Sequence, residues 1–164
     1  MSTWFFFLSQ FSIIAFALVG GVFLAFSDFI MRSRATAQSP GGIEVMQVIN
    51  REVFRYVFMT LFLGMAAVSL VIIGSAYFSL QGPAATLIMV AAGVYLIGVF
   101  GVTVVFNVPL NNLLAGMDSM SADAMDFWTT RYLPSWTFWN SVRTVGCVLA
   151  AGSHLFGLIW LAQP

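Results

Sequence analysis

The chain has 164 residues, of which 60% are hydrophobic and only 7% are charged, and its mean hydropathy is +0.96. A soluble domain could not cover that much apolar surface, so the composition predicts an integral membrane protein whose spans contact the lipid bilayer. Six arginines balance six acidic residues at zero net charge, which excludes a basic surface for nucleic acid. The single cysteine, Cys147, has no partner for a disulfide bond.

The apolar stretches predict an all-α fold, namely a four-helix transmembrane bundle with short interfacial helices in the first and third connections. Spans are expected at about residues 4–30, 53–78, 84–106 and 136–161, within a single transmembrane domain over residues 1–164. The first span has no basic region before its apolar core and no small-residue cleavage site after it. This pattern favours a retained helix over a signal peptide.

Two features of the first span suggest contacts. Ala17, Gly21 and Ala25 recur every four residues, and we expect this face to pack closely against another helix. Asp28 lies near the end of the span, with Arg32 four residues later on the same side of the helix. The two residues are typical of an ion pair at the lipid headgroups, and the alternative is that Asp28 is a functional carboxylate.

The two polar connections have helical patterns. In residues 42–54, apolar positions recur at helical spacing, and Gln47, Asn50 and Arg51 lie between them. The third connection is acidic and then aromatic. It predicts a second interfacial helix over residues 125–132 that leads to a break at Pro134.

The third span reaches the membrane surface in a stretch rich in amides, residues 106–112. Pro109 lacks a backbone donor, so the helix is expected to end or kink there. Asn107 then lies about one turn inside the apolar layer, where its amide needs partners. Two interpretations remain open for Asn107 and Asn111: they cap free carbonyls at the helix end, or they face a ligand.

The fourth span carries an arginine close to aromatic residues. Trp136, Asn140 and Arg143 are spaced by four and three residues and share one helix face, with Trp139 beside them. An arginine within a span costs about 2.5 to 3.5 kcal/mol on insertion scales unless it pairs or reaches the interface. Arg143 therefore either has a function or extends to the nearby membrane surface.

The distribution of charge predicts the orientation. Five arginines fall on the side of the polar connections, so this side is expected to be cytoplasmic, with both termini outside, as in a bacterial inner-membrane protein. His154 lies about 21 Å along its helix from Asn140 and is expected in the outer half, with Gln10 as a candidate hydrogen-bond partner. The histidine and cysteine spacing does not fit a metal site.

The remaining polar residues should lie at one depth near the cytoplasmic surface, with tryptophan rings as flat apolar walls. Such a cluster can bind a planar, weakly acidic molecule that arrives from the membrane. Alternatively, it holds the four helices in one arrangement. The candidate residues are Asp28, Asn50, Arg51, Asn107, Asn111, Asn140 and Arg143, with Trp136 and Trp139.

Four motifs in the chain resemble those of the anthrone-oxygenase-like membrane family. They are GVFLAFSDF (21–29), MQVINR (46–51), FNVPLN (106–111) and WTFWNSVRT (136–144). The resemblance implies oxidation of an anthrone to an anthraquinone by O2 without a cofactor. In this family a histidine often follows the asparagine of the last motif, whereas this chain has Ser141 there.

The resemblance leads to a hypothesis for the mechanism. Asp28 would remove a proton from the substrate, and Arg143, Asn140 and Asn107 would stabilise the resulting oxyanion. The tryptophans would hold the rings, and the substrate-binding set would be Asn50, Arg51, Asn107, Asn111, Trp136 and Trp139. The alternative is a non-catalytic binding or accessory subunit that works as a homo-oligomer or beside a partner subunit, with a structural polar cluster and no cavity.

Overall fold

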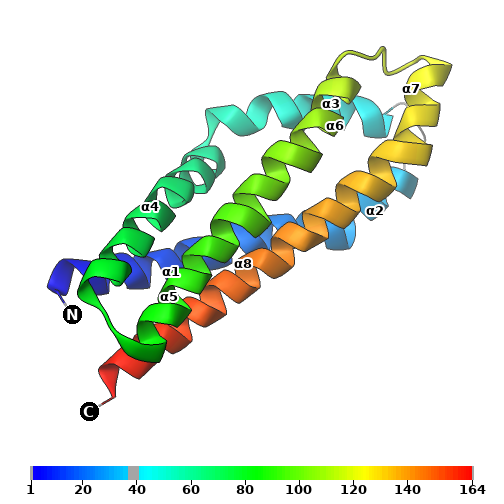
Figure 1. Cartoon of the computed structure of the whole chain (residues 1–164). Helices are drawn as coiled ribbons and strands as arrows, with labels where there is room; N and C mark the ends of the chain where they lie inside the picture. The colour runs from blue at the N-terminus through cyan, green and yellow to red at the C-terminus, as the bar shows by residue number, and fades with distance from the viewer. Residues whose placement is uncertain (1, 37–40, 164) are drawn as a thin grey trace.

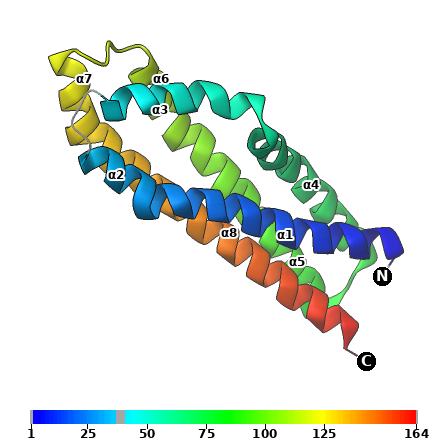
Figure 2. The same ribbon diagram turned by 180° about the vertical axis from the view of Figure 1, so that it is seen from behind.

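The computed structural model describes residues 2–36 and 41–163, and within these ranges the chain is helical and has no β-strand. Four continuous helical rods of this part are long and apolar enough to cross a membrane: Thr3–Thr36, Val57–Ser79, Gly82–Ala115 and Ala122–Ala162. They pack as one bundle (Figure 1), which Figure 2 shows from behind. The predicted all-α four-helix transmembrane bundle is confirmed.

Three of the rods combine α-helical and π-helical segments. The first consists of α1 (Thr3–Ala25), the π-helical turn η1 (Phe26–Ile30) and α2 (Met31–Thr36), and the second is α4 (Val57–Ser79). The third consists of α5 (Gly82–Val94), the π-helical segments η3 (Tyr95–Gly101) and η4 (Thr103–Asn107), and α6 (Val108–Ala115). The fourth consists of α7 (Ala122–Phe127), the π-helical turn η5 (Trp128–Tyr132) and α8 (Leu133–Ala162).

The rods differ in length, with 34, 23, 34 and 41 residues. At 1.5 Å per residue, the three longer rods exceed about 50 Å, whereas the hydrocarbon core of a bilayer is about 30 Å thick. The excess lies at the end that carries α2, α6 and α7, which we call the polar end (Figure 1). Here α3 (Gly41–Glu52) and the 3-10 turn η2 (Val53–Arg55) lead into α4. The start of α1 and the end of α8 lie at the opposite end of the bundle (Figure 1).

Apolar side chains fill the interior and also cover the outside of the bundle. In the middle, a buried cluster joins α1, η3 and α8 and includes Phe16, Tyr95 and Cys147, each 0% exposed. Large apolar residues also face outward, for example Phe78 at 85% and Ile97 at 77% exposure. An apolar exterior of this kind is stable only in contact with lipid or another apolar surface.

The close approach of α1 to α8 uses a different small residue from the one expected. The predicted packing face is wrong at Ala17 and Gly21, because both are exposed. Gly20 is buried instead, and a Cβ added there would lie 2.7 Å from the Cβ of Cys147. A spacing of four residues does place residues on one helix face. Because Gly20 and Gly21 are adjacent, however, the sequence did not show which of the two faces α8.

Pro109 and Pro134 do not interrupt their rods. Of the end or kink expected at Pro109, the end is wrong, and so is the expected break at Pro134. Each proline lies in the first turn of an α-helical segment, α6 or α8, directly after a π-helical segment. The first turn is where the missing backbone donor of proline costs least. A change of hydrogen-bond register before the proline therefore lets the rod continue.

The expected interfacial helix of the first connection is present as α3, and polar contacts hold it in place. Gln47 Nε2 donates hydrogen bonds of 2.8 and 2.9 Å to the carbonyl oxygens of Leu114 and Met117, at the end of α6. Arg34 Nη1 donates to the carbonyl oxygen of Gly42 at 3.2 Å. These contacts hold α3 in place beside the candidate site.

Candidate functional site

A cavity of about 320 Å³ opens at the polar end, between α1, the α3–α4 connection and α8. Its inner part is formed by Arg143 and by rings of buried aromatic residues, among them Phe23 and Trp136. Phe54 and Tyr56 form the outer part and are 69% and 65% exposed. The volume is at the lower end of the range of roughly 300 to 1,000 Å³ typical of small-molecule sites.

Arg143 is the buried cation of this cavity, with 4% of its surface exposed. Its Nη2 donates a 2.6 Å hydrogen bond to Asn140 Oδ1, and its Nη1 donates a 3.2 Å hydrogen bond to Thr103 Oγ1. The guanidinium carbon lies 4.2 Å from the centre of the Phe23 ring and 5.3 Å from that of Trp136. The side chain is therefore held in the interior and does not extend to the membrane surface.

Arg143 forms no salt bridge within residues 2–36 and 41–163. The salt bridge found in these ranges joins Glu52 and Arg55. The Nε atom of Arg143 is also buried without a hydrogen-bond partner. A buried charge without a counter-ion is costly, since desolvation removes several kcal/mol of hydration. Both features favour a ligand that brings a negatively charged or strongly accepting oxygen.

Asn140 positions Arg143 and does not itself line the cavity. Its Nδ2 donates 2.6 Å hydrogen bonds to the carbonyl oxygen of Phe23 and to Ser27 Oγ, while its Oδ1 accepts from Arg143. The side chain is fully buried. The Nδ2 and Oδ1 atoms of Asn140 thus both form hydrogen bonds within the protein. The bonds from Nδ2 join α8 to the end of the first rod.

Asn111 connects the cavity wall to a stack of aromatic rings. Its Oδ1 accepts hydrogen bonds from Tyr132 Oη at 2.8 Å and from Trp136 Nε1 at 2.9 Å. Asn50 Nδ2 approaches Tyr132 Oη at 3.5 Å, at the limit for a hydrogen bond. Because two donors occupy the carbonyl oxygen of Asn111, its amide nitrogen is the part available to a ligand, and both Asn50 and Asn111 line the cavity.

Asn107 is buried behind the cavity. Its Nδ2 donates a 3.2 Å hydrogen bond to the carbonyl oxygen of Trp136, and its Oδ1 has no partner among the described residues. It therefore links η4 to α8 and is absent from the cavity lining. Neither of the two interpretations from the sequence, a cap on its own helix or a ligand contact, describes this arrangement.

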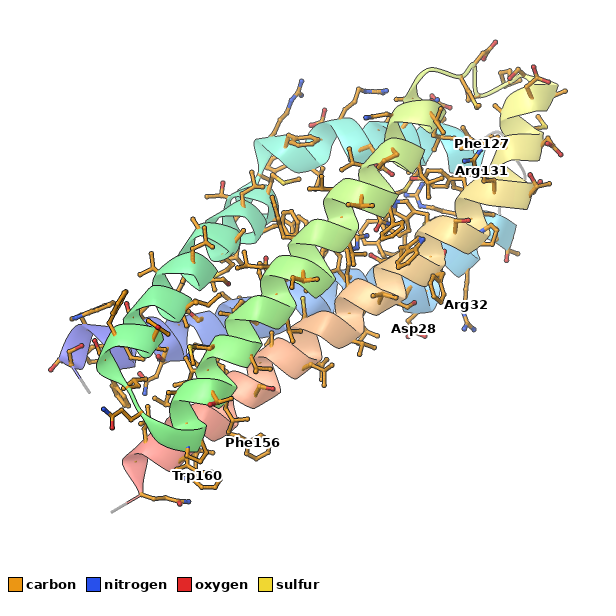
Figure 3. The ribbon with its side chains drawn as sticks, in the orientation of Figure 1. Asp28, Arg32, Phe127, Arg131, Phe156 and Trp160 are labelled. Carbon is orange, nitrogen blue, oxygen red and sulfur yellow. The ribbon has the colours of Figure 1, made fainter. Side chains whose placement is uncertain are left out.

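Besides Asn107 and Asn140, three more of the expected site residues are absent from the cavity lining. Asp28 and Arg51 are exposed and absent from its lining. Figure 3 shows Asp28 and Arg32 on the outer side of the first rod, and the expected ion pair between them is not formed. Trp139 stacks on Phe106 with ring centres 3.6 Å apart, away from the cavity.

Among the residues of the site that reasoning from the sequence missed are Thr103, Glu52 and Tyr132. Thr103 and Glu52 line the cavity, and Tyr132 holds Asn111. The spacing of four residues from Tyr132 to Trp136 could have identified the tyrosine, because it places both rings on one helix face. Their ring centres lie 6.3 Å apart and nearly parallel. Thr103 and Glu52 carry no distinctive local pattern.

Ser141 faces another part of the surface. It lines a separate groove between the first rod and α8, and its Oγ lies 3.1 Å from Ser27 Oγ. The cavity that contains Arg143 does not include it. Ser141, the position where the resemblance suggested a histidine, therefore lies outside the cavity lining.

Comparison with known proteins identifies the family. The model of the family described as Anthrone oxygenase matches residues 51–153. The chain belongs to this family. No curated protein and no solved structure matches the chain. The matched region includes the cavity residues Glu52, Thr103, Asn111, Trp136 and Arg143.

Proposed function

We propose that this member of the anthrone oxygenase family is a membrane oxygenase that uses O2 to convert a planar phenolic or anthrone-type substrate into a quinone. The observation that carries the proposal is the guanidinium of Arg143, which lines an aromatic cavity and has no acidic partner among the described residues. Such a cation favours a substrate that becomes an oxyanion during the reaction.

The walls of the cavity suit a flat aromatic molecule. The rings of Phe23 and Trp136 lie close to Arg143 at the inner end, and Phe58 and Phe62 of α4 continue the apolar lining. An anthrone is neutral and apolar, so it concentrates in the bilayer, where exposed apolar residues surround the bundle. The substrate then binds with its rings in the apolar part and its carbonyl oxygen toward Arg143.

The chemistry begins with the weak acidity of the central methylene group of an anthrone. Loss of one proton moves an electron pair onto the carbonyl oxygen, and Arg143 stabilises the resulting anthrolate. The electron-rich anion reacts with O2 at the former methylene carbon and gives a hydroperoxide. Loss of water then leaves the second carbonyl group of the quinone. Asp28 is exposed outside the cavity, so we give it no part in this reaction.

The proposal includes an orientation in the membrane. Arg32, Arg34, Arg51, Arg55 and Arg131 belong to α2, α3, η2 and η5, all at the polar end of the bundle. An excess of arginine at one membrane surface favours the cytoplasmic side. We therefore place the cavity near the cytoplasmic surface and both termini on the outside, in a bacterial inner membrane.

The test is O2 uptake and quinone formation by the detergent-purified protein with a model anthrone, corrected for spontaneous oxidation. Arg143→Gln should lower kcat/KM by about 100-fold or more, because oxyanion-stabilising donors contribute on this scale. Arg143→Lys keeps the charge and should retain more activity than Arg143→Gln. Arg131→Gln is the matched control, because Arg131 is exposed and lies against Phe127, outside the cavity. Equal activity of the native protein and Arg143→Gln would refute the proposal.

One set of contacts favours a second candidate, a non-catalytic binding or accessory subunit. Asn107 and Asn140 use their amide groups to join neighbouring rods, as a structural polar cluster does. In that case the folded protein oxidises anthrone no faster than the background. It should still bind an aromatic anion such as anthrolate anaerobically, and Arg143→Gln should weaken this binding.

A further inference from the structure

Among the described residues, the cavity lining contains one carboxylate. It belongs to Glu52 and not to the exposed Asp28. Glu52, the last residue of α3, lines the cavity together with Asn50 and Tyr56. Asn50 and Glu52 belong to α3 and Tyr56 lies in the α3–α4 connection, whereas Arg143 belongs to α8. The cavity therefore has a carboxylate at its partly exposed wall and an arginine at its buried wall.

The surroundings of Glu52 suit transfer of a proton to water. Its Oε1 accepts a 2.9 Å hydrogen bond from Arg55 Nη1, while its second carboxylate oxygen has no partner among the described residues. The side chain of Glu52 is 37% exposed and that of Arg55 is 71% exposed. Glu52 thus reaches both the cavity and the solvent at the polar end.

We propose that Glu52 is a catalytic residue that accepts the methylene proton of the substrate, an inference that rests on the proposed function. The C–H bond breaks, an O–H bond forms at the Glu52 carboxylate, and the electron pair moves through the ring to the carbonyl oxygen near Arg143. The proton then passes to water, and O2 oxidises the anthrolate as described above. In total, one anthrone and one O2 give one anthraquinone and one water.

The shape of an anthrone matches this division of roles. Its carbonyl group and its methylene group are at opposite positions of the central ring, so one binding orientation can direct the carbonyl to Arg143 and the methylene to Glu52. The rings between them would contact Phe23, Phe58 and Phe62, which line the cavity. A base and an oxyanion-stabilising cation on different walls act together because the substrate is conjugated from one group to the other.

The proton-transfer step can be measured without O2. The native protein, incubated anaerobically with anthrone in D2O, should exchange the methylene hydrogens for deuterium faster than buffer alone, as followed by NMR or mass spectrometry. Glu52→Gln should lower this catalysed exchange by about 100-fold, within the range for loss of a general base. With the methylene deuterated, the native protein should also show a primary isotope effect on quinone formation.

Two control variants separate the carboxylate from its surroundings. Glu44→Gln removes a carboxylate from an exposed position of the same helix and should leave the exchange unchanged. Arg55→Gln removes the ion pair but keeps Glu52, so most of the exchange activity should remain. If the loss in Glu52→Gln came from the broken ion pair, Arg55→Gln would show it as well. That result would overturn the role of Glu52.

The outcomes also distinguish this inference from the proposed function. If the native protein forms quinone and Glu52→Gln forms it equally fast, the oxygenase proposal stands and the role of Glu52 is wrong. At a pH high enough for free anthrone to ionise in solution, Glu52→Gln should recover, while Arg143→Gln should remain impaired. A native protein with neither exchange nor oxidation would overturn both proposals.

Discussion

If the unpaired charge of Arg143 drives the reaction, then an internal counter-ion should strongly lower the activity. Thr103→Asp provides one, because Thr103 Oγ1 lies 3.2 Å from Arg143 Nη1 and aspartate is close to threonine in size. For two unit charges at this distance and an effective dielectric constant of about 20, the attraction is about 5 kcal/mol. The desolvation of the new carboxylate opposes this gain, so the net change in stability should be small.

The substrate oxyanion then has to compete with the introduced carboxylate for the same guanidinium. If only half of the attraction is lost from the transition state, the rate falls by about 100-fold, since 1.4 kcal/mol corresponds to a factor of ten. The assay is kcat/KM for anthrone oxidation, together with thermal unfolding in detergent to verify the fold. Thr103→Asn introduces a side chain of nearly the same shape as aspartate but without its charge, so the activity of this variant should fall by less than tenfold. A folded Thr103→Asp protein with native activity would contradict the assigned role of Arg143.

Two further predictions concern stability, measured as thermal unfolding in detergent. His154 is fully buried and both its ring nitrogens lack partners among the described residues, so His154→Phe should raise stability by about 1 to 3 kcal/mol; a less stable variant would indicate a polar partner such as bound water. Gly20→Ala should lower stability by about 1 to 3 kcal/mol, because its Cβ would lie 2.7 Å from that of Cys147. The double substitution Gly20→Ala with Cys147→Gly removes the opposing Cβ and should recover part of the loss.

The sequence is sufficient to predict the membrane class, because apolar stretches long enough to span a bilayer have few alternatives. It also predicts that Trp136 and Arg143 share one helix face, since α8 is regular between them. The expected partner Gln10 for His154 is wrong, because Gln10 is exposed whereas His154 is buried. The position of a residue along its helix shows whether two residues lie at the same depth in the bundle. Whether their side chains are in contact depends on the rotation of each helix about its axis.

Asp28 illustrates why residues expected at one depth need not share a site. It lies in the π-helical turn η1, where each residue advances by a smaller angle than in an α-helix, so the depth of a residue along the span does not give the direction of its side chain. The sequence FSDFI of this turn has no proline or glycine that would announce the change. Glu52 was overlooked for another reason, since a glutamate three residues before an arginine is an ordinary pair on a helix surface.

Three of the four π-helical segments among the described residues lie at the cavity or support its lining. η4 contributes Thr103 to the cavity, η1 contributes Phe26, and η5 ends at Tyr132, which holds Asn111. A π-helical turn carries a wider backbone ring that an α-helix can accommodate only at a cost, and such turns are frequent at functional sites. A purely structural polar cluster could be built on regular helices at lower cost. The position of η1, η4 and η5 on the rods that enclose Arg143 is therefore an independent argument for ligand binding at this end of the bundle.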